Sequence, residues 1–234
     1  MIISNYLNCL KELESNINVE FIEDYTKKSV GGFPKEIFPD EKEAILDFAN
    51  IKLKDKDIES FDLASTTISW RSLLSLRDVV LKGGFAFNGI TDALILPTDY
   101  FKNITNIKND GDYSQQLGWF ERLPMGVDDS MRGCFIKEEG DFPPPIAFCN
   151  AGGEWYVKLD FDYYKYIELL FQNYGFKGWQ YFYIDIVKEI PRLDQVLDDM
   201  RIAVKTLPLL FPDKDWSYHQ KKYQDVLEKL ERTE

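Results

Sequence analysis

The sequence has 234 residues, of which 44% are hydrophobic and 15% aromatic, so the chain can bury a substantial core and does not resemble a disordered protein. Forty acidic residues against 28 basic ones give a net charge of -12, which disfavours binding to nucleic acid or to an anionic membrane surface. The same charge would attract a basic protein partner, although ordinary solubility also accounts for it.

The first part of the chain predicts two helices with an irregular connection over residues 19–39. Ser4 is a candidate cap for the first helix. Asp40 followed by Glu43 resembles a capping box and predicts the second, and residues 53–60 predict a solvated loop. The apolar residues of the two helices are Leu7, Leu10, Leu13 and Ile17, then Ala44, Ile45, Phe48 and Ile51.

From Ser69 apolar residues recur at helical spacing and predict a third helix, which Gly83-Gly84 would end. They are Trp70, Leu73, Leu74, Val80 and Leu81, and Arg77 stands at the same helical spacing. The chain then predicts a short β-segment (85–87), an Asn88-Gly89 turn, a brief strand (93–96), a short helix (97–104), a long loop that is functional or flexible (108–133) and a strand (134–137).

Residues 146–187 are the densest concentration of core-forming side chains. The runs 146–149 and 155–159 flank a glycine turn and predict a hairpin. After Asp160 the period becomes helical and ends at Gly175. Residues 179–187 fit a buried strand and a buried helix equally well. Most aromatic residues here should be core, although Trp and Tyr also anchor interfaces.

Two more helices follow. The first covers residues 193–207 and would end at Pro208, and the last runs to residue 230, capped by Asp215 or Ser217. The only histidine, His219, falls in the last helix among Gln220, Lys221 and Lys222. We expect it to be an exposed polar residue rather than the base of a Ser-His or Cys-His relay. One imidazole is also far from a zinc ligand set.

No catalytic, cofactor-binding or metal-binding residue is therefore predicted, and we expect a non-enzyme without a cofactor. Adjacent acids could still form a hydrolytic couple if folding brought two of them into one cleft at the right separation. The candidates are Asp128-Asp129, Glu138-Glu139 and Asp198-Asp199.

The three cysteines are widely spaced and form no Cys-x-x-Cys pair, which argues against a disulfide framework and for a reducing compartment. The N-terminus lacks a basic segment followed by an apolar block, and no apolar run is long enough to cross a bilayer. We expect a cytoplasmic protein.

The order of the predicted elements resembles the SUKH superfamily, also called the Smi/Knr type. The matching positions are the Asn88-Gly89 turn, the strand and helix over 94–101, the strand pair with a glycine turn over 146–159, and the helix over 161–171. The chain has Gly140-Asp141-Phe142 and Gly152-Gly153-Glu154 where the family has a compact Gly-Asp-Gly. The helical segment after Trp179 is longer than a minimal member needs.

The resemblance implies a single α+β domain with a central, mostly antiparallel sheet surrounded by helices. We expect this domain to span residues 1–190, with residues 191–234 as a helical extension packed on it. The resemblance also implies an immunity protein that binds and neutralises a cognate toxin. The alternatives are a carboxylate-dependent hydrolase and a regulatory scaffold in cell-envelope synthesis.

An acidic surface could mask a basic toxin domain through electrostatic complementarity. We expect the contacts to come from acids in the long loop and its flanks. They are Asp110, Asp112, Asp128, Asp129, Glu138 and Glu139.

Overall fold

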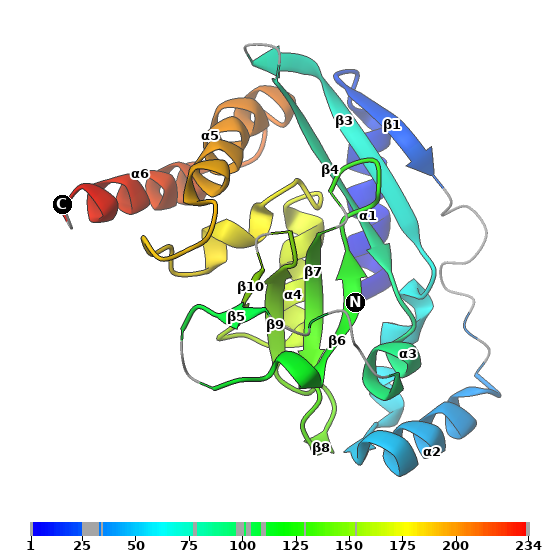
Figure 1. The fold of residues 1–234 in the computed structure, drawn as a ribbon. Helices are drawn as coiled ribbons and strands as arrows, with labels where there is room; N and C mark the ends of the chain where they lie inside the picture. The colour runs from blue at the N-terminus through cyan, green and yellow to red at the C-terminus, as the bar shows by residue number, and fades with distance from the viewer. Residues whose placement is uncertain are drawn as a thin grey trace.

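An eight-stranded sheet organises the molecule (Figure 1). The computed structural model describes residues 2–24, 33, 35–76, 79–96, 101, 104–108, 111–128, 130–152 and 154–232. In the order of the sheet, the strands are β1 (Val19–Asp24), β3 (Thr67–Leu76), β4 (Val79–Phe87), β6 (Leu117–Arg122), β7 (Met131–Ile136), β9 (Ile146–Asn150), β10 (Trp155–Lys158) and β5 (Thr105–Asn106). β5 and β10 are parallel, and the other neighbours in this sheet are antiparallel.

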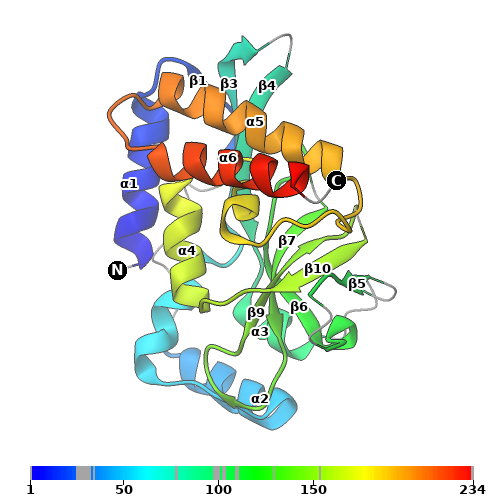
Figure 2. The same ribbon diagram turned by 90° about the vertical axis from the view of Figure 1, so that its left-hand side faces the viewer.

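Helices surround the sheet, which confirms the expected α+β fold class. They are α1 (Ile2–Ser15), α2 (Phe38–Ala49), α3 (Ile90–Ile95), α4 (Tyr163–Gln172), α5 (Leu193–Leu210) and α6 (Ser217–Glu231), with 3-10 helices η2 (Asp55–Leu63), η4 (Ser114–Gln116) and η5 (Trp179–Tyr183). A second, two-stranded parallel sheet joins β2 (Ile51–Lys52) to β8 (Gly140–Asp141). Figure 2 shows α1 and α4 side by side, with α5 and α6 crossing above them.

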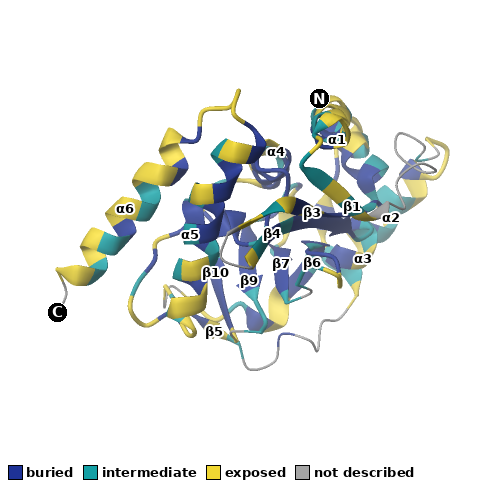
Figure 3. Ribbon diagram, turned by 90° about the horizontal axis from the view of Figure 1, so that it is seen from above, coloured by how far each residue is buried: buried dark blue, intermediate teal, exposed yellow. Residues whose placement is uncertain are grey.

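The two faces of the main sheet carry separate hydrophobic clusters, because successive side chains of a strand point to opposite faces. Phe135 and Phe148 belong to the larger core, whereas their neighbours Cys134 and Cys149 belong to a smaller cluster with Phe101. Figure 3 shows α1, α4 and α5 on one side of the sheet. The larger core therefore lies between the sheet and α1, α4 and α5, and buried residues of α2, α3 and η2 extend it.

The predicted hairpin and helix of the central segment are confirmed as β9, β10 and α4. Asp162 caps α4, since its Oδ1 accepts a hydrogen bond of 2.9 Å from the Lys165 N–H. Gly175 follows the helix with a φ of 57°, and its N–H donates to the Leu170 carbonyl at 2.9 Å. Residues 179–183 form a 3-10 helix rather than a strand.

The third predicted helix is wrong, because residues 67–76 and 79–87 form the antiparallel strands β3 and β4. The register of this pair shifts between Arg71 and Ser75, so the apolar residues lose the period of two that would mark a strand. Gly83 lies inside β4 opposite Trp70, where an added Cβ would come within 2.5 Å of the indole. Arg77 lies outside the described residues.

The N-terminal part needs three corrections. Residues 19–24 form β1, because they pair with β3 despite their scattered apolar pattern. α1 begins at Ile2, so Ser4 lies inside the helix, and the face that packs on the core differs from the predicted stripe. That face consists of Ile2, Tyr6, Cys9 and Leu13, whereas Leu7 and Ile17 are exposed.

The predicted solvated loop at 53–60 overlaps η2, in which Ser60, Phe61 and Leu63 are buried. α2 begins at Phe38, before the predicted cap at Asp40. Residues 93–96 largely belong to α3, because they pack on β6 and β7 instead of pairing as a strand. Most of the predicted helix at 97–104 falls outside the described residues. The long loop at 108–133 contains η4, β6 and the first residues of β7.

The two C-terminal helices are confirmed as α5 and α6, although Pro208 lies inside α5 rather than at its end. α5 lies against β3, β4 and η5 and buries Met200, Ala203 and Leu207. Residues 191–234 therefore supply part of the larger core.

Candidate functional site

The four described acids among the predicted partner contacts do not form one patch. Asp110 and Asp129 lie outside the described residues. Asp128 precedes β7, whereas Glu138 and Glu139 follow it. A strand of this length separates its two ends by about 20 Å at roughly 3.3 Å per residue, so the structure assigns these acids to opposite ends of the sheet.

Asp112 is held close to β10, near the β5 edge of the sheet. Its Oδ1 accepts a hydrogen bond of 3.0 Å from the Ser114 N–H, and it lies 3.5 Å from the Tyr156 hydroxyl. The hydrogen bonds from Ser114 lower the pKa of Asp112 below its usual value. This carboxylate therefore shapes the loop that precedes β6.

Asp128 is joined to Asp199 of α5 through Lys177. The Lys177 Nζ lies 3.4 Å from the Asp128 Oδ2 and 3.3 Å from the Asp199 Oδ2. The Ser130 hydroxyl donates to the other oxygen of Asp128 at 2.6 Å. Three segments far apart in the sequence thus converge on one small charged cluster.

This cluster borders a cavity of 190 Å³. Burial raises the pKa of Asp199 to about 6, against the opposing effect of Lys177, and the neighbouring Asp128 and Asp198 raise it further. A paired acid with one raised pKa is the arrangement that a carboxylate-dependent hydrolase would need. The cavity is smaller than the roughly 300–1,000 Å³ of most ligand sites, and Lys177 already occupies the space between the acids.

Glu121 of β6 is a buried carboxyl that the sequence analysis did not single out. It accepts a hydrogen bond of 2.8 Å from the Tyr166 hydroxyl, which in turn accepts one of 3.1 Å from Gln180. Burial raises the pKa of Glu121 to about 8, although Tyr166, Gly133 and two nearby arginines oppose the shift. The carboxyl is therefore mostly protonated at neutral pH. An alternation of apolar and polar residues over 117–122 would have predicted this strand and the inward side of Glu121, but the register shift in β6 interrupts the alternation.

His219 is buried, so the prediction of an exposed polar residue is wrong. Its Nε2 lies 2.7 Å from the Asn173 Oδ1. The Asn173 amide nitrogen donates to the Leu169 carbonyl, so its oxygen accepts from His219. Burial lowers the pKa of His219 to about 4, which keeps the imidazole neutral. Rings of Phe176, Phe182, Tyr183, Trp216 and Tyr218 surround it. Its role is to fasten α6 to α4.

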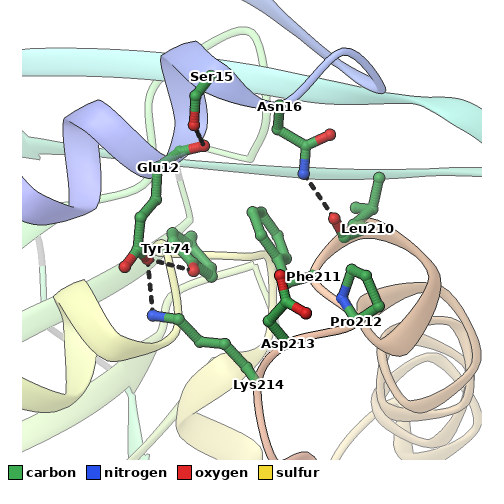
Figure 4. A pocket seen from close by; sticks show the side chains of 9 residues that line it. All are labelled: Glu12, Ser15, Asn16, Tyr174, Leu210, Phe211, Pro212, Asp213 and Lys214. Atoms are coloured by element: carbon green, nitrogen blue, oxygen red, sulfur yellow. Dashed lines mark hydrogen bonds and ion pairs between the residues drawn. The ribbon is translucent and has the colours of Figure 1, made fainter.

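A cavity of 250 Å³ lies where α1 meets the turn between α5 and α6 (Figure 4). Glu12 accepts hydrogen bonds from Lys214 at 2.7 Å and from the Tyr174 hydroxyl at 2.5 Å. Asn16 donates to the Leu210 carbonyl at 2.6 Å, and Tyr174 stacks on Phe211 with ring centroids 3.9 Å apart. Because these side chains are hydrogen-bonded to one another, the residues that line the cavity connect the C-terminal helices to α1.

The most unusual surface lies at the α2 end of the molecule, far from α6 (Figures 1 and 2). Asp40, Glu43 and Asp47 of α2 are exposed, and none of them forms an ion pair with a residue that the structure describes. Glu139 lies at the same end, because the N–H of the next residue, Gly140, donates a hydrogen bond to the carbonyl of Asn50, just after α2. Its side chain is also exposed.

We call these four residues, together with Glu138, the acidic end. Glu138 lies 4.0 Å from the Lys158 Nζ. Glu138 and Glu139 are among the predicted partner contacts, whereas Asp40 and Glu43 are predicted as a helix cap and the sequence predicts no role for Asp47.

The apolar residues of α2 are divided between the core and the solvent. Phe38 and Ile45 are buried. Phe48, which the sequence analysis placed among the apolar residues of this helix, is 76% exposed, and Leu46 is 41% exposed. Exposed apolar side chains beside acids make α2 the best candidate for a protein-binding surface.

Within the described residues, no helix is both long enough and apolar enough to cross a membrane. In the same part of the chain, no three His, Cys, Asp or Glu side chains are grouped to hold a metal ion. A scan against protein-family models, a search of curated proteins and a search of solved structures each gave no match.

Proposed function

We propose that this chain is a non-enzymatic cytoplasmic binding protein of the toxin-immunity type, which neutralises a basic toxin domain. The observation that carries the proposal is the acidic end, where Asp40, Glu43 and Asp47 face solvent without an ion pair to a described residue. The resemblance to the SUKH superfamily supplies the class of partner.

Electrostatics supports this choice of partner. A net charge of -12 produces a field that accelerates the approach of a basic protein and repels an acidic one. Several other surface carboxylates already have a cationic partner, as in the Glu20–Arg71 and Asp185–Lys229 pairs at 2.6 and 2.7 Å. Unpaired acids at one end are therefore the groups that a basic partner would engage.

The test is capture of the product of the adjacent reading frame by the tagged full chain, at low and at high salt. We expect stoichiometric capture that weakens as salt rises, because exposed charges are screened. Recovery of the chain alone at both salt concentrations would contradict the proposal. Capture of an endogenous cell-envelope protein instead would favour the regulatory-scaffold alternative.

The second candidate is a carboxylate-dependent hydrolase, which the cluster of Asp128 and Asp199 favours. In that case Asp199, with its pKa of about 6, would be the proton donor. A screen of chromogenic glycosides and esters would detect turnover that Asp199→Asn abolishes and Asp198→Asn preserves. Equal rates for the wild type and Asp199→Asn would exclude this use of the cluster.

A further inference from the structure

The outer face of α2 has a regular chemical pattern. Phe38 and Ile45 point into the core. Asp40, Glu43 and Asp47 are spaced three and four residues apart, so they form a single stripe along the opposite side of the helix. The stripe faces solvent over almost the whole length of α2.

Apolar side chains flank this stripe on both sides. At about 100° per residue, Leu46 and Phe48 project roughly a quarter turn to either side of the acids. Their exposed fractions, 41% and 76%, show that neither is covered by the rest of the described chain. The helix therefore presents a central line of negative charge between two apolar edges.

The stability of α2 explains only part of this pattern. Asp40 lies in the first turn, where the helix dipole favours an acid, but Asp47 lies in the last turn, where the dipole disfavours one. Lys42, the only basic residue of the helix, turns away from the stripe and pairs with Asp55 of η2 at 2.9 Å. The carboxylates of the stripe therefore remain available to bind a cationic partner. Phe48 is mostly exposed to solvent, so its side chain gives α2 little stability through burial.

We propose that this face of α2 docks into a groove of the partner that has basic side chains along its floor and apolar walls. An amphipathic helix set into a groove is a common mode of protein recognition. Charge complementarity selects a basic partner, and Phe48 and Leu46 would anchor it by burial. This inference rests on the proposed function, because it names the surface that would carry the binding.

The test uses a fluorescently labelled synthetic helical peptide in which a central row of lysines lies between two rows of leucines, so that it presents the chemistry expected of the groove, titrated against the full chain at low salt. We expect binding that weakens about tenfold in Asp40→Asn/Glu43→Gln/Asp47→Asn and by a similar factor in Phe48→Ser. The substituted side chains are exposed, so the fold should remain intact, which far-ultraviolet circular dichroism would check.

Two matched controls carry the same changes elsewhere. Asp225→Asn/Glu228→Gln/Glu231→Gln removes three exposed acids from α6, and Leu209→Ser removes a 62% exposed apolar side chain from α5. We expect both controls to bind the peptide as the wild type does.

Undiminished binding by the α2 variants, or an equal loss in the controls, would overturn the docking surface. The outcome is separate from that of the capture experiment. If the adjacent product is captured and the α2 variants still bind the peptide fully, the function stands and the surface is wrong. If only the peptide binds, and it does so through α2, the surface stands and the toxin partner is wrong.

Discussion

Glu121 shows what burial does to a single carboxyl. Its folded pKa of about 8 lies far above the ordinary value of 4.5, so the folded chain holds a proton that the unfolded chain releases. The contribution of this protonated carboxyl to the unfolding free energy is therefore fully present below about pH 4, and it is lost as the pH rises through 8.

Glu121→Gln should remove this loss, because glutamine can accept the Tyr166 hydrogen bond and never ionises. We expect the variant to match the wild type near pH 5 and to exceed its unfolding free energy by more than about 1 kcal/mol at pH 9. Urea unfolding at the two pH values measures this. If Glu121→Gln had a lower unfolding free energy than the wild type at both pH 5 and pH 9, Glu121 would be ionised in the folded state.

Asp199 should make the unfolding free energy depend on pH in the same direction, but over a more acidic range. Its pKa rises from 3.8 to about 6, so stability decreases as the pH rises between those values. Asp199→Asn should be more stable than the wild type at pH 7, by on the order of 2 kcal/mol, because the raised pKa means that burial of the carboxylate outweighs its attraction to Lys177.

The control is Asp198→Asn, since Asp198 is exposed and pairs with Arg201 at 3.0 Å. We expect this variant to change the unfolding free energy by less than about 0.5 kcal/mol. Destabilisation by Asp199→Asn at pH 7 would instead mean that the ion pair with Lys177 outweighs the burial of the carboxyl.

The junction between α4 and β4 depends on Gly175. It has a φ of 57°, and its carbonyl accepts a hydrogen bond of 2.9 Å from the Gly84 N–H. A Cβ on Gly175 would come within 2.5 Å of the Gly84 carbonyl oxygen, which is backbone and cannot turn aside.

Gly175→Ala should therefore lower the unfolding free energy by about 2 kcal/mol or more. Gly126→Ala is the matched control, because the nearest atom to its added Cβ would be 3.8 Å away. The measurement is the midpoint of thermal unfolding, which should be clearly lower for Gly175→Ala than for Gly126→Ala. Similar midpoints would mean that the end of α4 can move away from β4 without cost.

For the whole molecule, the main question is whether residues 191–234 are an appendage or part of the core. α5 buries Met200, Ala203 and Leu207 against the sheet and η5, and His219 of α6 bonds to Asn173. We expect a chain that ends at Ile190 to lose cooperative unfolding, because this removal exposes the aromatic residues beneath α5 and α6.

A chain that ends at Glu231 is the control. It keeps the whole of α6, including the buried Val226 and Leu230, which packs against the core, and it loses only residues 232–234. We expect its unfolding midpoint in urea to lie close to that of the full chain. Cooperative unfolding of the chain that ends at Ile190 would show that residues 1–190 fold independently.

Local signals in the sequence were sufficient for the central hairpin and for α4, α5 and α6. Their turns, caps and apolar periods lie within a few residues of one another, as with Asp162 before α4 and Gly175 after it. Such signals operate between neighbours along the chain and do not depend on the rest of the fold. The acidic composition likewise predicted the kind of partner that we propose.

Only the tertiary structure decided the features that depend on distant neighbours. β3 and β4 are strands because they pair with each other, and the register shift hides their period. His219 is buried by aromatic rings, and Asp128 is joined to Asp199 through Lys177. Phe48 follows the apolar pattern of α2 but lies outside the core, because burial depends on what the fold brings against each side chain.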